Sequence, residues 1–289
     1  MLSAPSNAEQ VQDCMQHLST RNRDKSISCV TNLINQSPKN TYNYILRATI
    51  YSSFNEASKA IEDLTYVIGI DGKNCQAFSL RGIIYSHQNR YNEAIADISN
   101  GIRVCSAAGS KTLMGSLYSQ RANLHSQVRA FQKSTNDYEQ AAKIMDSISQ
   151  AQWAIIHGKN SIATRGNLFS EIYQGICSNY IKVQNFTESL QACKKSLEYQ
   201  PNNTMAQINL ASSYIELNRH SDAINLLESI TDKSQLFLVN YNLSMANLKL
   251  YKQSKDDMYK TQFELYKQKA SAVAKSPENI AIIEKNLRT

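Results

Sequence analysis

Histidine and cysteine are the residue types here that could hold a metal or start a reaction, and neither is spaced for it. The five histidines show no H-E-x-x-H or comparable ligand spacing. The sequence also has no Walker A, G-x-S-x-G or G-x-G-x-x-G element. We therefore expect a protein that is not an enzyme, with no catalytic residue, no cofactor and no metal site. The histidines are His17, His87, His125, His157 and His220.

The six cysteines lie far apart, and no C-x-x-C pair occurs among them. In a chain of 289 residues this pattern predicts reduced, mostly buried thiols that fill the core, not a disulfide framework or a zinc site. The N-terminal residues lack the pattern of a secretory signal, and no run of 18 apolar residues occurs. We expect a cytoplasmic protein without a membrane span. The cysteines are Cys14, Cys29, Cys75, Cys105, Cys177 and Cys193.

Arginine and aspartate recur at a fixed distance in the first half of the chain. In each pair the arginine precedes the aspartate by 16 residues. That distance would place the partners on two successive helices of one hairpin. An exposed ion pair there contributes about 0–1 kcal/mol to stability. The alternative is a row of arginines that meets acidic ligands. The pairs are Arg47 with Asp63, Arg81 with Asp97, and Arg121 with Asp137.

The elements that would position these residues follow from an internal repeat with a period of about 34 residues. The window from Tyr44 to Leu64 recurs as Phe78 to Ile98, with Arg, a small residue, Tyr, Ala and Asp in register. A third copy begins a few positions later than this period predicts, and the second half of the chain shows the same spacing again. With only 9 Gly and 4 Pro for turns, the chain favours an all-α structure.

This pattern resembles the tetratricopeptide repeat (TPR) family, which places small residues at repeat positions 8, 20 and 27 and large ones at 4, 11 and 24. The resemblance implies a right-handed α-α superhelix of about six or seven helix-turn-helix repeats with a C-terminal capping helix. Five copies are clear, at 41–74, 75–108, 115–148, 170–203 and 204–236. Two more are marginal, at 7–40 and 237–270.

The repeats suggest two arrays with an irregular join. We expect an N-terminal array over 1–147, an irregular helix or loop over 148–169, a C-terminal array over 170–270 and a capping helix over 271–289. The join is either a longer helix with a connecting loop, or a hinge or partner-docking element. In the capping helix we expect Ser276 as N-cap and Pro277 at the first position, with one apolar face. That face would hold Ile280, Ile283 and Leu287.

The resemblance also implies where a partner would bind, because the first helix of each repeat lines the concave face. The side chains expected there are polar and mostly uncharged, so they could hydrogen-bond an extended peptide backbone. Asn209 and Asn242 share a repeat position and could form a short ladder. The alternative is a solvated face that no ligand occupies. The expected groove residues are Gln76, Ser79, Ile83, His87, Gln120, Asn123, Gln127, Gln174, Lys182, Asn209 and Asn242.

The net charge of +7 is unevenly distributed, because no acid lies between Asp97 and Asp137 or between Asp146 and Glu171. These basic stretches could meet an acidic partner, or they could simply keep the convex faces soluble. RNA binding by helical repeats normally needs base-reading residues in every repeat, and no such set recurs. The residues of the expected basic patch are Arg103, Lys111, Arg129, Lys133, Lys159 and Arg165.

Together these features predict a non-catalytic scaffold or adaptor that binds a protein segment, as a subunit of a larger, for example ciliary or cytoskeletal, assembly. We expect a protein partner, not a nucleic acid or a small-molecule substrate. One alternative is a co-chaperone of Hsp70 or Hsp90. Their acidic C-termini are captured in the family by a five-residue carboxylate clamp, which is missing because Leu46, Leu80 and Gln76 occupy clamp positions. The other is a basic nucleic-acid-binding repeat.

Overall fold

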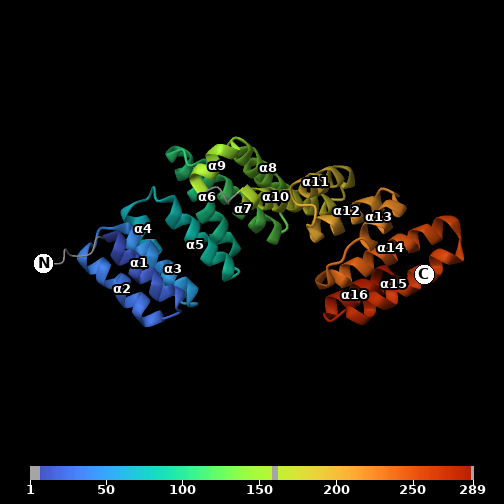
Figure 1. Ribbon diagram of the computed structural model, residues 1–289, viewed down its shortest axis with the longest axis horizontal. Helices are drawn as coiled ribbons and strands as arrows, with labels where there is room; N and C mark the ends of the chain where they lie inside the picture. The colour runs from blue at the N-terminus through green and yellow to red at the C-terminus, as the bar shows by residue number, and fades with distance from the viewer. Residues whose placement is uncertain (1–6, 158–161, 288–289) are drawn as a thin grey trace. The chain divides into compact units, whose positions relative to one another are not determined.

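The computed structural model describes residues 7–157 and 162–287. Within these ranges every regular element is helical, with sixteen α-helices, one short 3-10 helix and no strand (Figure 1). The all-α prediction is confirmed. Within each unit, most helices pack on the helices next to them in the chain, as expected where each hairpin buries its apolar face on the next.

The chain divides into two compact units, residues 1–128 and 129–289. The helices of the first unit are α1 (Asn7–Ser19), α2 (Arg23–Gln36), α3 (Thr41–Ser53), α4 (Ala57–Ile70), α5 (Cys75–His87), α6 (Tyr91–Ala108) and α7 (Lys111–Gln127). Those of the second unit are α8 (Phe131–Asp146), α9 (Gln150–His157), α10 (Ile162–Lys182), α11 (Phe186–Tyr199), α12 (Thr204–Glu216), α13 (His220–Glu228), η2 (Lys233–Gln235), α14 (Leu236–Ser254), α15 (Asp257–Val273) and α16 (Pro277–Asn286).

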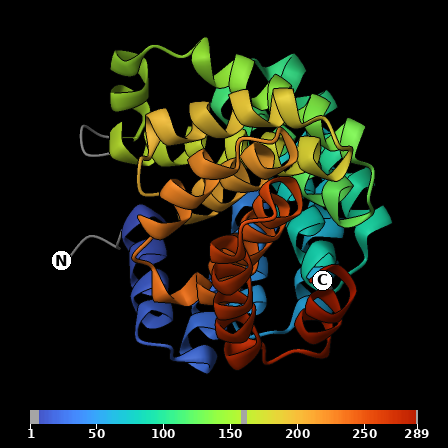
Figure 2. The same ribbon diagram turned by 90° about the vertical axis from the view of Figure 1, so that its right-hand side faces the viewer.

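The predicted repeats correspond to helix pairs within each unit. In the first unit α1 packs on α2, α3 on α4 and α5 on α6, so the marginal copy at 7–40 also forms a pair. In the second unit α10 packs on α11, α12 on α13, and α14 on α15 over the marginal copy at 237–270. Figure 2 shows α14 and α15, in orange and red, running side by side. The predicted domain boundaries at 147 and 170 stay predictions.

The turns explain how a sequence with so few glycines makes so many hairpins. Non-glycine residues hold the left-handed conformation with φ near +60° at the turns inside the hairpins, among them Asn55, Asn89, Gln184 and Asn218. Asparagine tolerates this conformation better than most residues. The next helix often starts on a capping asparagine, and the side chain of Asn74 accepts a hydrogen bond from the Ala77 amide.

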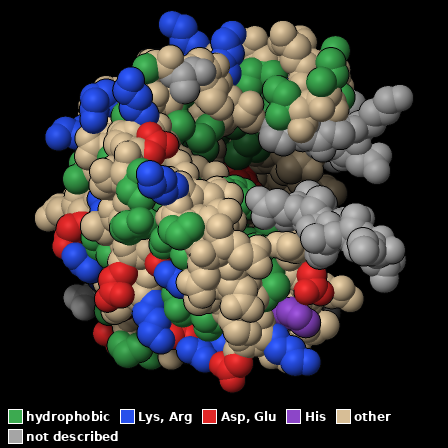
Figure 3. Space-filling model, turned by 90° about the vertical axis from the view of Figure 1, so that its left-hand side faces the viewer, with side chains coloured by type: hydrophobic (Ala, Val, Ile, Leu, Met, Phe, Trp, Pro, Cys, Tyr) green, Lys and Arg blue, Asp and Glu red, His purple; other side chains and the backbone are tan. Residues whose placement is uncertain are grey.

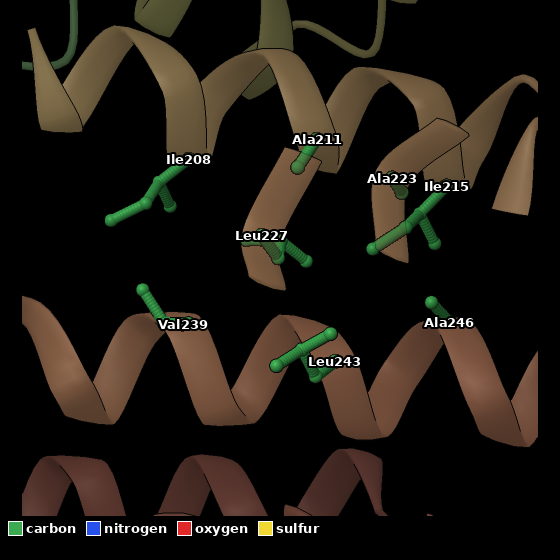
Figure 4. Close-up of a cluster of buried hydrophobic side chains, with 8 residues drawn as sticks. All are labelled: Ile208, Ala211, Ile215, Ala223, Leu227, Val239, Leu243 and Ala246. Atoms are coloured by element: carbon green, nitrogen blue, oxygen red, sulfur yellow. The ribbon is translucent and has the colours of Figure 1, made fainter. Parts of the chain in front are cut away.

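The core is a row of apolar clusters, each shared by consecutive hairpins of one unit. Figure 4 shows one of them, in which Ile208, Ala211 and Ile215 of α12 face side chains of α13 and α14. The alanines allow close approach of the helices, and the larger side chains fill the space between them. Each hairpin thus depends on its neighbour for part of its burial.

The C-terminal helix caps this row almost as the sequence predicts. Ser276 caps α16 by accepting a hydrogen bond from the Asn279 amide, and Pro277 holds the first helical position. Ile283 and Leu287 are buried against Leu248 and other residues of a shared apolar cluster. The expectation for Ile280 is wrong, because this side chain is 46% exposed. Only the two residues one turn apart reach the cluster.

The prediction of reduced thiols is also wrong, because all six cysteines are paired. Disulfides join Cys14 to Cys29, Cys75 to Cys105, and Cys177 to Cys193, with Cα–Cα distances of 5.5, 5.5 and 5.2 Å. Each bond links the two helices of one hairpin. The physical reason is geometric, because the two helices of each hairpin bring the Cα atoms of its cysteines within the distance that a disulfide spans, which the spacing along the chain does not reveal. Two of the pairs have sequence separations of 15 and 16 residues.

The segment over 148–169 contains a short helix and the start of a long one. α9 buries Trp153 but leaves Ile155 and Ile156 exposed. After it, α10 begins at Ile162 and runs on into the next hairpin. The expected element is therefore helical from Gln150 onward in its described parts, and its role as a hinge or docking element stays a prediction. None of the described helices is long and apolar enough to cross a membrane.

Candidate peptide-binding site

A pocket of about 290 Å³ opens between α5 and α7 of the first unit, and we call it the N-terminal pocket. Its floor includes Ile98 of α6, which lies behind the two lining helices. Five of the expected groove residues converge here from α5 and α7. Its lining residues are Gly82, Ile83, Ser86, His87, Ile98, Gln120, Asn123, Leu124 and Gln127.

The N-terminal pocket has an apolar floor and a polar rim. Ile98 and Leu124 are buried, whereas His87, Asn123 and Gln127 are exposed. None of the lining residues is an aspartate, glutamate, lysine or arginine. Such a combination suits a ligand that places an uncharged group inside and polar groups at the edge.

Gly82 allows this geometry because α5 crosses α6 closely at that point. A Cβ atom on residue 82 would lie 2.7 Å from Cδ1 of Ile98 and 3.3 Å from the carbonyl oxygen of Ala94. The first distance is too short for two carbon atoms that are not bonded, so a larger residue would displace Ile98. The glycine and the isoleucine together therefore set the floor of the N-terminal pocket.

The side-chain amide of Gln120 is only half satisfied. Its Nε2 donates to Oγ of Ser116 at 3.1 Å, whereas its Oε1 is buried and has no hydrogen-bond partner. A buried acceptor without a donor typically costs about 1–3 kcal/mol. A ligand N–H group in the N-terminal pocket could supply the missing donor once the Gln120 side chain turns to expose Oε1.

A second pocket of about 410 Å³ lies in the second unit, among α10, α11, α12 and α14, and we call it the C-terminal pocket. It differs in charge, because Lys182 and Glu216 both line it. Glu216 also forms an ion pair with Lys249 at 2.9 Å. The lining residues are Ile181, Lys182, Gln184, Phe186, Ser212, Ile215, Glu216, Tyr241, Asn242 and Met245.

The remaining expected groove residues lie outside these two pockets. They are Gln76, Ser79, Gln174 and Asn209. The suggested ladder of Asn209 and Asn242 is wrong. Asn242 Nδ2 donates to the Leu238 carbonyl at 2.8 Å, and its Oδ1 accepts from Ser212 at 3.0 Å. Local partners on α12 and α14 thus satisfy Asn242, and Nδ2 of Asn209 has no partner.

The sequence pattern missed the apolar floor of the N-terminal pocket, namely Gly82, Ile98 and Leu124. Ile98 comes from the second helix of its hairpin, which the repeat pattern does not assign to the concave face. Gly82 is the one sequence feature that could have indicated this floor. It takes the place that Ala48 holds in the preceding repeat, and the missing methyl group brings α6 closer.

Two of the predicted Arg–Asp pairs are two-point ion pairs between the helices of one hairpin. Arg47 donates from Nε and Nη2 to Asp63 at 2.8 and 2.7 Å. Arg81 bonds Asp97 in the same way. Arg121 and Asp137 lie in different units, so their pairing stays a prediction. Arg121 also donates from Nη1 to Ser99 at 3.0 Å.

The residues of the expected basic patch are spread over both units. Arg103 and Lys111 are exposed in the first unit, and Arg129 and Lys133 in the second. Arg165 is half-buried and donates to the carbonyl of Ile148 at 3.1 Å, just after the C-terminal end of α8. Lys159 lies outside the described residues. Figure 3 shows acidic and basic side chains interspersed over much of the face in view.

No group of three His, Cys, Asp or Glu residues that could hold a metal ion occurs in the described part of the chain. The comparisons with known proteins concern the fold. Residues 180–243 match the tetratricopeptide repeat family, and these residues run from the end of α10 into α14. Over these residues the chain carries tetratricopeptide repeats. No curated protein sequence matches the TPR chain at a significant level.

Solved TPR structures share the fold over most of the chain. The C-terminal part of a TPR protein from Cytophaga hutchinsonii matches with a TM-score of 0.63 and 12% identity, over 96% of this chain and all of the other. PilF of Pseudomonas aeruginosa matches with a TM-score of 0.58 and 10% identity, over 89% and 96% of the chains. YrrB, described as having an unusual peptide-binding site, matches with a TM-score of 0.57 and 16% identity, over 73% of this chain and 96% of the other.

Proposed function

We propose that this TPR protein is a scaffold that binds a peptide segment of a partner protein in the N-terminal pocket. The observation that carries the proposal is the convergence of Ile83 and His87 of α5 with Gln120, Asn123 and Gln127 of α7 on one pocket. Side chains of α5 and α7 can contact an extended segment at several points. The rim amides offer both donors and acceptors for its backbone.

The likeness to known structures supports a binding role in general terms. The fold is shared with YrrB, which is described as having an unusual peptide-binding site. At 16% identity the likeness concerns the fold alone, so the residues that would bind a peptide here rest on the geometry of this chain. The carboxylate-clamp alternative gains no support from the N-terminal pocket, because no lysine or arginine lines it.

The expected cytoplasmic location and the place in a ciliary or cytoskeletal assembly stay predictions. Three disulfides weigh against a reducing compartment, because glutathione and thioredoxin keep most cytosolic thiols reduced. Fractionation of cells followed by blocking of free thiols would test both the location and the pairing in one sample. Thiols that are all free in a cytosolic fraction would support the original prediction.

Selection of a random peptide library on the full chain tests the binding role. The blocking variant is Ser86→Trp, which places an indole in the N-terminal pocket. Its matched control is Ser52→Trp, because Ser52 holds the same position of α3 and lies outside the pocket. We expect the selected peptides to bind wild type and Ser52→Trp and to lose at least about tenfold affinity for Ser86→Trp.

Two results would contradict the proposal. One is a set of peptides that binds wild type and Ser86→Trp equally, with unchanged melting temperatures for both variants. The other is a strongly salt-dependent association of the chain with RNA and none with peptides, which would favour the nucleic-acid alternative. Circular dichroism of each variant separates loss of binding from loss of folding.

A further inference from the structure

The shape and the lining of the N-terminal pocket define the class of side chain that it can accept. Its floor is formed by Ile98 and Leu124, both buried, with Ile83 half-buried beside them. Apolar surface of this kind gains free energy when it is covered by another apolar group. A volume of about 290 Å³ lies at the small end of ligand sites, which suits one large side chain and not a helix.

Charge separates this pocket from its counterpart in the second unit. The C-terminal pocket has Lys182 and Glu216 in its lining, whereas the N-terminal pocket has no charged residue. A carboxylate or ammonium group entering the N-terminal pocket would lose its hydration and find no opposite charge in the lining. The occupant must therefore be uncharged in the part that enters.

The second requirement comes from Gln120. Its Oε1 is buried without a partner while its Nε2 is held by Ser116. Because this oxygen is covered in the unliganded structure, the Gln120 side chain must turn toward the pocket before a donor of the ligand can reach it. An extended peptide carries such a donor, a backbone N–H, next to every side chain. The apolar floor and the unpaired acceptor are thus matched by one peptide residue, through its side chain and a neighbouring amide.

We propose that the N-terminal pocket binds a partner segment in extended form, through one large uncharged apolar side chain and an adjacent backbone N–H that donates to Oε1 of Gln120. This inference rests on the proposed peptide-binding function and specifies its ligand. Leu, Met and Phe fit the description. Acidic segments, which the carboxylate-clamp proteins bind, do not.

The first experiment varies the side chain. Gly-Ser peptides of equal length carry a single central Leu, Phe, Ala, Asp or Lys, and their binding to the full chain is followed by NMR titration. We expect the Leu and Phe peptides to bind at least about tenfold more tightly than the Ala peptide, since a buried large side chain contributes far more than a methyl group. The Asp and Lys peptides should bind no better than Ala.

The second experiment tests the hydrogen bond. Methylation of the backbone nitrogens flanking the central Leu removes the donors, and Gln120→Leu removes the acceptor at similar volume. We expect N-methylation to weaken binding to wild type by about tenfold, the loss of roughly one well-formed bond. It should have little effect on binding to Gln120→Leu. Gln268→Leu is the matched control, on an exposed site of α15 in the other unit, and should behave like wild type.

The outcomes distinguish this inference from the function on which it rests. If the Asp or Lys peptide binds as tightly as the Leu peptide, or N-methylation weakens wild type and Gln120→Leu equally, the ligand assignment is overturned. Peptide binding in the pocket then still stands, provided that Ser86→Trp abolishes it. If no peptide of any class, selected or designed, responds to Ser86→Trp, the proposed function itself fails.

Discussion

Arg81 and Asp97 form a two-point ion pair across the α5–α6 hairpin, with Nε to Oδ2 at 2.7 Å and Nη2 to Oδ1 at 2.8 Å. The remaining nitrogen, Nη1, donates to Oγ1 of Thr65 on α4 of the preceding hairpin at 2.9 Å. One guanidinium thus ties three helices together. Its pKa is raised above the usual range, chiefly by the hydrogen bonds to Asp97.

The arrangement recurs with the period of the sequence. Arg47 pairs with Asp63 and donates to Thr31, which lies one full repeat before Thr65. Ser99, which accepts from Arg121, follows Thr65 at the same interval. These hydroxyls form a second periodic feature beside the Arg–Asp spacing. Because the guanidinium of Arg81 is already bonded on three sides, the structural role accounts for it without an acidic ligand.

Arg81→Met should therefore destabilise the first unit. The side chain of Asp97 is only 8% exposed, so the substitution leaves a buried carboxylate without its partner. We expect a loss of about 3 kcal/mol in the free energy of unfolding, measured by urea titration. The double variant Arg81→Met/Asp97→Leu should recover most of it. An equal loss in both variants would mean that the pair itself is not what holds the hairpin.

The disulfides should stabilise the hairpins that they close. For Cys177 and Cys193 the closed loop spans 16 residues, for which chain entropy gives about 3 kcal/mol. We expect a reducing agent, or Cys177→Ala/Cys193→Ala, to lower the melting temperature of the second unit. The double variant should then lose part of its sensitivity to reduction. Alkylation of the native, unreduced protein should modify no cysteine, and labelling of six thiols would refute the pairing.

His220 should make the second unit sensitive to acid. The residue is 2% exposed, and neither ring nitrogen has a hydrogen-bond partner. Burial lowers its pKa below the usual 6.5, and Lys249 of α14 lowers it further, while Glu216 of α12 acts in the opposite direction. The unfolded chain therefore takes up a proton at a higher pH than the folded chain does.

Stability should then fall as pH drops below about 6.5, by at most about 1.4 kcal/mol per pH unit, and level off below the folded pKa. Urea titrations of wild type and His220→Leu between about pH 7.5 and 5 would measure this. We expect the slope to be smaller in His220→Leu. The control His17→Leu, on α1, retains His220 and should retain the acid loss. Identical slopes for wild type and His220→Leu would rule out His220 as the cause.

The left-handed turn residues predict a stabilising change. Gln184 has φ of 59° between α10 and α11, a conformation that costs a side chain about 1–2 kcal/mol relative to its preferred regions. Glycine adopts it freely, so Gln184→Gly should raise the melting temperature, although added freedom in the unfolded chain offsets part of the gain. The matched control is Gln200→Gly, because Gln200 ends α11 with φ of −142°. That control should be neutral or destabilising.

The hairpins could be predicted from the sequence because the small residues that let their helices pack recur with the repeat period. Residues such as Ala60 and Ala94 hold the same position of successive repeats, and both are fully buried in the structure. Periodic burial needs no knowledge of distant contacts. The same holds for the capping helix, where Ser276 and Pro277 act within a single turn.

What the sequence did not predict depends on contacts between side chains of different helices. The pairing of Cys75 with Cys105 requires that α5 and α6 bring residues 30 positions apart within disulfide reach. The floor of the N-terminal pocket likewise depends on where Gly82 lets Ile98 lie. The predicted Asn ladder failed for the same reason, since Asn242 found Ser212 and Leu238 instead.

The disulfides also set a mechanical property of the chain. Each joins two helices of the same hairpin, so it leaves the contacts between hairpins free to open while the loop that it closes cannot lengthen. The three loops span 15, 30 and 16 residues. If the chain were pulled from its ends until every helix unravelled, these loops would withhold roughly 200 Å of extended backbone. Reduction would release that length and make the molecule a longer tether.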